Sequence, residues 1–217
     1  MSESAARVNR SKFAQKTILM RNRFRSIAFQ TFIALIIAAG LTACKKDNDA
    51  AFSKSESPLQ EWVTSNTFTN IKLSEGPYSL GYQFIVWRDG KITGLGLSSP
   101  ITGDFNVRLY NVTDQTMLAE MTVTVKPTDT TSVKSFVYAK LPTPVVVTSS
   151  KEYVVAYSTV NSSDSFYRFD KGTQFSLPFL STNTNISVES GVYGDANAYP
   201  DVSWPNVYTA DIQFTAN

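Results

Sequence analysis

The alternating pattern of NVRLYNVTDQTMLAEMTVTVK, residues 106–126, decides the fold. In its second half every other residue is apolar, namely Met117, Ala119, Met121, Val123 and Val125. Polar residues separate the later members of this series, namely Glu120, Thr122, Thr124 and Lys126. In the first half, Val107 and Leu109 flank Arg108 in the same way. Because successive side chains of a strand point to opposite faces, the stretch predicts two strands that each have one buried and one solvated face.

Short apolar runs of this kind continue from about Thr67 onward, and no helical period interrupts them. The further predicted strands are Tyr82–Trp87, Lys91–Leu97, Val133–Lys140, Tyr153–Thr159, Phe166–Phe169, Ile186–Val192 and Tyr208–Phe214. Asp89-Gly90, between two of these runs, predicts a tight type I′ hairpin. We therefore expect an all-β domain over residues 67–217. Its expected form is an antiparallel, jelly-roll-like sandwich of two sheets, because one sheet of this size would leave an apolar face in water.

The composition excludes several kinds of chemistry. The 217 residues include no His and one Cys, while 42% of them are hydrophobic. Without His, a Ser-His triad, a Cys-His pair and every His metal ligand are impossible. With one Cys, the chain has no internal disulfide, no cysteine zinc site and no Cys-x-x-Cys redox pair. The hydrophobic content is sufficient for a packed core, so the chain is not expected to be disordered as a whole.

Residues 1–43 are predicted to be a cleaved signal peptide. They contain seven basic residues and one acid, followed by the short apolar run Ile27–Ala39. This run is shorter than the roughly 20 residues that a spanning helix needs, and small residues follow it, as in secretory signals. Leu41-Thr42-Ala43-Cys44 resembles the bacterial lipobox. The resemblance implies that Cys44 receives diacylglycerol, that the chain is cut before it, and that its new amino group is acylated, for example with palmitate.

Several consequences depend on this interpretation. A signal of ordinary length would begin at Met20, so Met20 is the expected translation start. The alternative interpretation of Cys44 is that it is a buried core cysteine that follows an ordinary helix. The interpretation implies recognition by the lipoprotein-processing and sorting machinery.

Cleavage of the signal would also change the net charge. The chain has 20 basic and 18 acidic residues, and residues 1–43 contain seven of the former and one of the latter, so residues 44–217 have 13 basic and 17 acidic residues and a formal side-chain charge of −4. Nucleic-acid binding, which needs a basic face, therefore loses its support.

Residues 44–66 are predicted to be the lipidated Cys and a flexible tether, since residues 45–60 are rich in Lys, Asp, Ser and Ala and have no apolar period. Lys45 stands where an Asp would signal inner-membrane retention, so a lipid anchor in the bacterial outer membrane is expected. Cys44-Lys45-Lys46-Asp47 also resembles the start of surface lipoproteins in glycan-degrading Gram-negative bacteria. Display on the cell surface and attachment to the periplasmic face both remain open.

The order of landmarks over residues 67–216 resembles domain-of-unknown-function family 4082. The landmarks include Asp89–Leu95 (DGKITGL), Lys151–Tyr157 (KEYVVAY) and Asn206–Phe214 (NVYTADIQF). The resemblance implies a secreted bacterial module, often found beside glycan-processing or adhesive modules and similar in shape to carbohydrate-binding sandwiches. It supplies no catalytic residues. The chain departs from the family pattern at Tyr110, where the family usually has Trp.

The segment 193–206 (YGDANAYPDVSWPN) contains the candidate ligand site. Its candidate contacts are Trp204, Tyr199, Tyr193, Asp195, Asn197 and Asp201. Aromatic rings beside amide and carboxylate groups suit sugars, which offer C–H faces and hydroxyls, and ligand sites tend to lie on loops of a rigid scaffold. The alternative is that the tyrosines pack the sandwich end and that the Asp and Asn residues make turns. Asp195, Asn197 and Asp201 could also bind Ca²⁺ through oxygen, although the closing Glu of a calcium loop is missing.

We expect a binding protein rather than an enzyme. The preferred function is a lipid-anchored module of the cell envelope that binds glycan or a partner protein. The alternative is a structural docking component without a small ligand. A glycosidase with paired carboxylates is a third reading, and the candidate acids are Glu61, Glu75, Glu120, Glu152 and Glu189. Nothing in their spacing selects a pair, and no other cofactor is expected.

Overall fold

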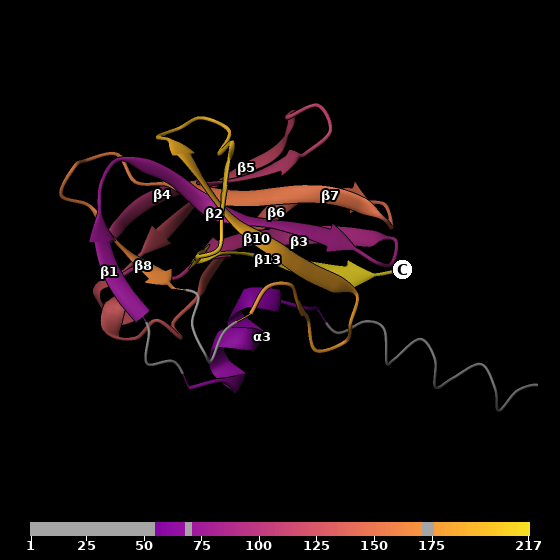
Figure 1. Ribbon diagram of the computed structural model, residues 1–217, viewed down its shortest axis with the longest axis horizontal. Coiled ribbons are helices and arrows are strands. Elements are labelled where there is room, and N and C mark those ends of the chain that lie inside the picture. Colours follow the sequence, from indigo (N-terminus) through magenta and orange to yellow (C-terminus); the bar gives the residue numbers. More distant parts are fainter. Residues whose placement is uncertain (1–54, 68–70, 171–175) are drawn as a thin grey trace, which may run out of the picture. The chain divides into compact units, whose positions relative to one another are not determined.

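The computed structural model describes residues 55–67, 71–170 and 176–217, and their folded part is built almost entirely from antiparallel strands (Figure 1). The larger sheet has the order β11 (Val202–Trp204), β10 (Ile186–Asp195), β2 (Tyr78–Val86), β7 (Lys151–Ser158), β4 (Gly103–Asn111) and β5 (Met117–Val125). The short strand β9 (Phe179–Leu180) also pairs with β10. The all-β, antiparallel sandwich predicted from the sequence is thus confirmed.

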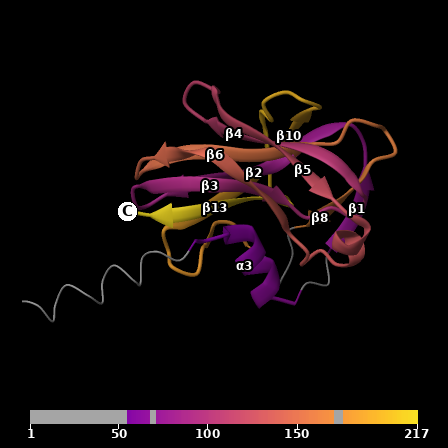
Figure 2. The ribbon, with the colours of Figure 1, turned by 180° about the vertical axis from the view of Figure 1, so that it is seen from behind.

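A second sheet with the order β13 (Ala210–Ala216), β3 (Gly90–Leu97) and β6 (Val137–Val147) forms the other layer of the sandwich (Figure 2). The core between the layers includes Phe84 and Val155 from the larger sheet and Leu95 and Phe214 from the second sheet, all of them fully buried. A third sheet, with the order β1 (Ile71–Glu75), β8 (Ser165–Phe169) and β12 (Val207–Tyr208), lies at one end. Of its strands, β8 was predicted as Phe166–Phe169, β1 was not predicted, and Tyr208 of β12 was assigned to the strand Tyr208–Phe214. A separate third sheet was not expected.

The alternation on which the prediction rested is present in β4 and β5. These strands pair from Gly103 opposite Val125 to Tyr110 opposite Met117. Val123 and Val125 are buried, whereas the polar residues between and before them are exposed. Met117, at the start of β5, is 53% exposed because the register shifts between Leu109 and Tyr110, which moves Met117 to the outer face of the sheet, opposite Tyr110.

The hairpin predicted at Asp89-Gly90 is wrong. Strands β2 and β3 belong to different sheets, so the connection carries the chain from one layer to the other. Asp89 Oδ1 accepts a hydrogen bond from the Ser149 N–H at 2.7 Å, which holds this crossing. Gly90 has no positive φ; it is required because a Cβ there would collide with the Phe214 ring.

The strand predicted over Val133–Lys140 begins and ends later, since β6 spans Val137–Val147. Pro142 and Pro144, of a residue type that is rare in the interior of a sheet, lie inside this strand. They are tolerated because β6 is an edge strand of its sheet, where a residue without an N–H breaks no central ladder.

Residues 55–66, assigned above to the flexible tether, belong to the folded domain. Helix α3 spans Pro58–Ser65, and its Leu59 and Val63 are fully buried. Just before it, the backbone of Glu56 exchanges two hydrogen bonds with Phe214 of β13. The tether prediction failed here because the helix has only about two turns, and its few apolar residues lie on both sides of residue 60, where the polar segment 45–60 ends.

The amino end of α3 is capped by a residue far away in the sequence. Asp211 of β13 accepts hydrogen bonds from the backbone N–H groups of Leu59 (3.2 Å) and Gln60 (2.9 Å). The helix and β13 lie side by side in both views (Figures 1 and 2). A carboxylate at a helix amino end satisfies otherwise unpaired donors, so this contact explains why so short a helix is ordered.

Within the described residues, no helix combines the length and the apolar character needed to cross a membrane.

Candidate functional site

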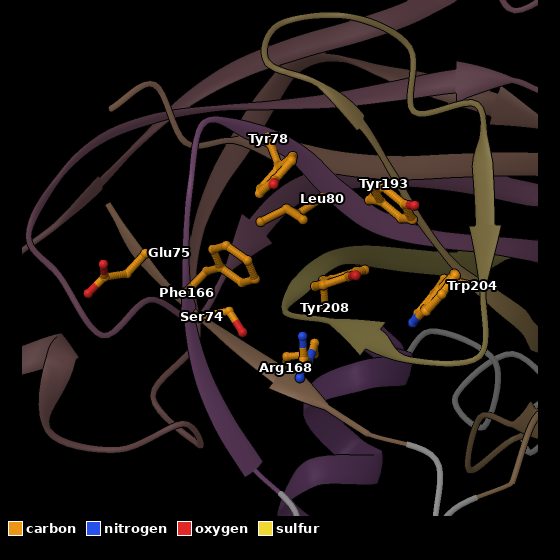
Figure 3. Close-up of a pocket in the computed structure, with 9 residues that line it drawn as sticks. All are labelled: Ser74, Glu75, Tyr78, Leu80, Phe166, Arg168, Tyr193, Trp204 and Tyr208. Carbon is orange, nitrogen blue, oxygen red and sulfur yellow. The ribbon is translucent and has the colours of Figure 1, made fainter. Parts of the chain in front are cut away.

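An aromatic pocket of about 460 Å³ lies where the third sheet meets strands β2, β10 and β11 of the larger sheet (Figure 3). We call it the first pocket. Nine residues line it: Ser74 and Glu75 of β1, Tyr78 and Leu80 of β2, Phe166 and Arg168 of β8, Tyr193 of β10, Trp204 of β11 and Tyr208 of β12. All of them lie on strands rather than on loops, so the sheets hold their positions.

Strand register explains how these side chains converge. Leu80 pairs with Tyr193 across β2 and β10, while Arg168 pairs with Tyr208 across β8 and β12. Residues two apart on a strand share a face, which places Tyr78 beside Leu80 and brings Phe166 to the side of Arg168. The pocket is therefore a product of ladder pairing in two different sheets.

The aromatic walls of the first pocket meet edge to face. The ring centroids of Tyr193 and Trp204 are 5.8 Å apart, with their planes at 86°. Those of Tyr78 and Tyr193 are 6.4 Å apart at 90°, and those of Phe166 and Tyr208 are 6.0 Å apart at 66°. Such T-shaped contacts are favourable for π-systems and hold each ring against its neighbour. The rings thus form a rigid wall.

The floor of the first pocket is buried and its rim is exposed. Leu80, Phe166 and Tyr208 are at most 5% exposed, whereas Tyr78 is 39% and Trp204 45% exposed. Figure 3 shows Trp204 at one side of the pocket and Glu75 at the other, with the Glu75 carboxylate directed away from the rings. A ligand that enters would meet Trp204 and Tyr78 first.

Glycine makes the position of Tyr78 possible. Gly76, just before β2, has φ +143°, a conformation that side chains disfavour. A Cβ at Gly76 would also collide with the Tyr78 ring. The turn therefore lets this ring fold back over the pocket rim.

The one basic side chain among the described lining residues of the first pocket, Arg168, is paired with a carboxylate. Arg168 Nε donates a 2.6 Å hydrogen bond to Asp170 Oδ1, and Arg168 Nη2 donates a longer one, 3.4 Å, to Oδ2. Burial raises the pKa of Tyr208 to about 12, although the Arg168 cation opposes this shift. The Tyr208 hydroxyl thus stays protonated at neutral pH and can donate a hydrogen bond.

A second pocket, of about 240 Å³, adjoins Trp204. It is lined by Leu177, Glu189, Ser190, Ser203, Trp204 and Pro205. The register of β10 against β2 shifts between Val188 and Ser190, so Glu189 lies in a β-bulge. Bulges re-aim side chains, and this one places Glu189 at the pocket.

The model of the domain of unknown function DUF4082 matches residues 63–209. The chain belongs to this family. The resemblance stated from the sequence landmarks is thereby confirmed, and the match begins within helix α3. A search of curated proteins finds no significant match to the chain.

Two of the six candidate ligand residues lie in the first pocket of this DUF4082 domain, namely Tyr193 and Trp204. The other four do not. Tyr199 packs instead on Tyr110, with ring centroids 5.3 Å apart, over the outer face of the larger sheet. The segment after β10 therefore covers that face, and its aromatic residues serve two different surfaces.

Asn197 has a structural role in the DUF4082 domain. Its Oδ1 accepts a hydrogen bond from Arg108 Nη2 at 3.2 Å, and its backbone N–H donates to Ser158 Oγ at 3.1 Å. Arg108 also donates to Glu120 Oε1 at 2.8 Å. Arg108, expected on a solvated face, is 9% exposed because this loop lies over it.

The calcium candidates gain no support from this geometry. Asp195 and Asp201 are exposed, and the Asn197 oxygen faces the Arg108 cation, which would repel Ca²⁺. Among residues 55–67, 71–170 and 176–217, no group of three acidic, His or Cys side chains could hold a metal ion.

Sequence reasoning missed Tyr78, Phe166, Arg168 and Tyr208 as pocket residues. The first three lie more than 20 positions before the candidate segment, so no local pattern joins them to it. The proposed lipidation site, Cys44, lies outside the described residues.

Proposed function

We propose that this protein is a lipid-anchored binding module of the bacterial envelope and that its first pocket binds glycan. The observation that carries the proposal is the cluster of rigid aromatic rings, with Trp204 and Tyr78 exposed at its rim. Sugar rings present C–H faces that pack on aromatic rings. A concave site lined by rings, with a few polar groups to orient the ligand, is the usual form of a small-molecule site.

Polar groups in the first pocket suit hydroxyl ligands. The Tyr208 hydroxyl, the Ser74 hydroxyl and the Arg168 guanidinium all line it. Hydroxyls can donate and accept, and guanidinium N–H groups donate, so together they can satisfy both functions of a sugar hydroxyl. Among the described residues that line the pocket there is one acid, Glu75, and its carboxylate is directed away from the rings (Figure 3). This arrangement favours binding over glycoside hydrolysis.

The anchoring part of the proposal rests on the sequence. A basic segment, a short apolar run and Leu41-Thr42-Ala43-Cys44 precede the domain. One acyl chain binds a membrane only marginally, and two or more give stable attachment. The proposed location is the outer membrane, with the choice between its two faces left to protease shaving of intact cells.

A glycan array tests the binding proposal. The purified full-length protein in mild detergent is expected to bind a restricted set of glycans, and Trp204→Ala should weaken that binding at least about tenfold, or about 1.4 kcal/mol. Trp87→Ala is the matched control, because Trp87 is 52% exposed and lies outside both pockets. Unchanged binding by Trp204→Ala, or equal losses in the two variants, would contradict the assignment of the site.

A further inference from the structure

Trp204 is shared by the first and second pockets. Trp204 lines the aromatic pocket beside Tyr193 and also lines the smaller pocket, which contains Glu189 and Ser203. The two pockets are therefore neighbours that share one residue. A ligand longer than the first pocket has the second pocket next to it.

The position of Trp204 keeps this path open. Strand β11 is at the end of the larger sheet, and all three of its residues are exposed. Gly191 lies opposite Trp204 in the ladder, and a Cβ there would collide with the carbonyl oxygen of Asn206, so the backbone that crosses at this point requires glycine.

The charges along the path disfavour an anionic ligand. The first pocket contains the Glu75 carboxylate and the Arg168 guanidinium, and the latter is already paired with Asp170 at 2.6 Å. Among the residues that the structure describes, the second pocket is lined by the Glu189 carboxylate and by no basic side chain. Because the Glu75 carboxylate is directed away from the rings (Figure 3), a chain of uronic acids or sulfated sugars would meet mainly the Glu189 carboxylate, and the described lining offers no unpaired cation to balance it.

We propose that the ligand is an uncharged glycan chain of several sugar units that crosses Trp204 and occupies both pockets. This inference rests on the proposed function, which it refines by chain length and charge. The first pocket holds one part of the chain against the aromatic rings, and the second holds the adjoining units. The second pocket adds affinity only for ligands long enough to reach it.

Chain length is the variable that tests the inference. Cellulose, xylan, mannan and starch oligosaccharides from the monosaccharide to the hexasaccharide are titrated into the full-length protein in detergent, with oligogalacturonides as the anionic series. For the series that binds, the hexasaccharide should bind at least about tenfold more tightly than the disaccharide. Equal affinities, or binding of the oligogalacturonides alone, would overturn the inference.

A variant in the second pocket separates the two proposals. Ser203→Leu places a branched apolar side chain at an exposed position of the second pocket and leaves the lining of the first unchanged. It should lower hexasaccharide affinity at least about fivefold and leave disaccharide affinity unchanged. Thr122→Leu is the matched control, since Thr122 is exposed on β5 at the opposite end of the sheet.

The outcomes distinguish failure of the inference from failure of the function. If Ser203→Leu and Thr122→Leu both bind every length as the unmodified protein does, the second pocket has no part in binding and the inference fails, while the first-pocket function stands. If Ser203→Leu weakens the disaccharide as much as the hexasaccharide, the two pockets are not separate subsites and the inference again fails. If no glycan of any length binds, the proposed function fails and the inference fails with it.

Discussion

The hydroxyl of Tyr138 donates a 2.7 Å hydrogen bond to Asp211 Oδ2 across the width of the second sheet. The two residues lie on its outer strands, and Gly96 of the central strand stands between them, paired with both. Because Gly96 has no side chain, the Tyr138 ring can cross it and reach the carboxylate. The same carboxylate caps helix α3, so one row of three residues joins the sheet to the helix.

Gly96→Ala is expected to destabilise the domain by about 1–3 kcal/mol, the usual range for overpacking. A Cβ at Gly96 would collide with the Tyr138 ring and approach the carbonyl oxygen of Val137 at 2.5 Å. Urea unfolding monitored by tyrosine and tryptophan fluorescence measures the change. In the double variant Gly96→Ala/Tyr138→Ala the ring collision is absent. The double variant should therefore lose less free energy of unfolding than the two single variants lose together. Strict additivity would show that the ring and Gly96 are not coupled.

Asp211→Ala is expected to cost about 3 kcal/mol or more, because it leaves several buried donors without their acceptor. These donors are the N–H groups of Leu59 and Gln60 and the hydroxyls of Tyr82 and Tyr138. Asp201→Ala, at an exposed position, serves as the control and should change stability by less than about 0.5 kcal/mol. Equal stability of the two variants would mean that the Asp211 network contributes nothing.

The stability of the domain should carry a pH dependence that comes from Asp211. Burial raises the pKa of this carboxyl to about 6, although hydrogen bonds from Tyr138, Gln60 and Tyr82 oppose the shift. A carboxyl whose pKa is higher in the folded chain binds more protons when folded. Its stabilising contribution is therefore fully present below the ordinary pKa of 3.8 and is lost as pH rises through about 6. The expected change is about 3 kcal/mol.

Asp211→Asn isolates this contribution, because the amide does not titrate. The free energy of unfolding is measured for both proteins between about pH 4 and pH 7. The unmodified protein should lose more stability over this range than the variant. Asp114 and Asp164, whose pKa values are lowered by hydrogen bonds, act in the opposite sense in both proteins and cancel in the comparison. Parallel pH profiles would contradict the assignment.

Arg108→Ala is expected to loosen the loop that follows β10. The guanidinium donates hydrogen bonds to Glu120, Ser158 and Asn197, and losing them should cost about 2 kcal/mol. The readout specific to the loop is hydrogen exchange at the Asn197 amide, which should become faster. Lys140→Ala, at an exposed position, is the control. Unaltered exchange at Asn197 would mean that other contacts hold the loop.

Cys44→Ala is expected to block lipidation and leave an unprocessed precursor. Mass spectrometry of the intact protein should show the acyl groups and the shortened chain in the unmodified protein, and neither in the variant. The test depends on the sequence alone, since Cys44 lies outside the described residues. Normal maturation and membrane attachment of the variant would contradict the lipid-anchor proposal.

Local alternation was enough to predict the β-sandwich, but not the connections between its strands. Asp89-Gly90 has the composition of a tight turn, yet it joins two layers, because Gly90 is needed beneath the Phe214 ring. The tether prediction failed in a similar way. Helix α3 is too short to show a clear period, and it is ordered by a carboxylate about 150 residues later in the chain.

The candidate site was predicted in part. Tyr193 and Trp204 were chosen because aromatic residues gather in that segment, and both line the first pocket. Tyr199, equally aromatic, lies on the opposite side of the sheet against Tyr110. Tyr199 lies in the loop between β10 and β11, and composition does not state over which face of the sheet a loop folds.

The sequence by itself determined that this chain forms strands with one apolar face and belongs to DUF4082, because alternation and family landmarks are local properties of the chain. Only the tertiary structure decided which residues share a site. Glu75, Arg168 and Trp204 come from three separated segments, and pairing between strands brings them together. The physical reason is that strand register is set by packing of the whole sandwich, and register decides which distant side chains become neighbours.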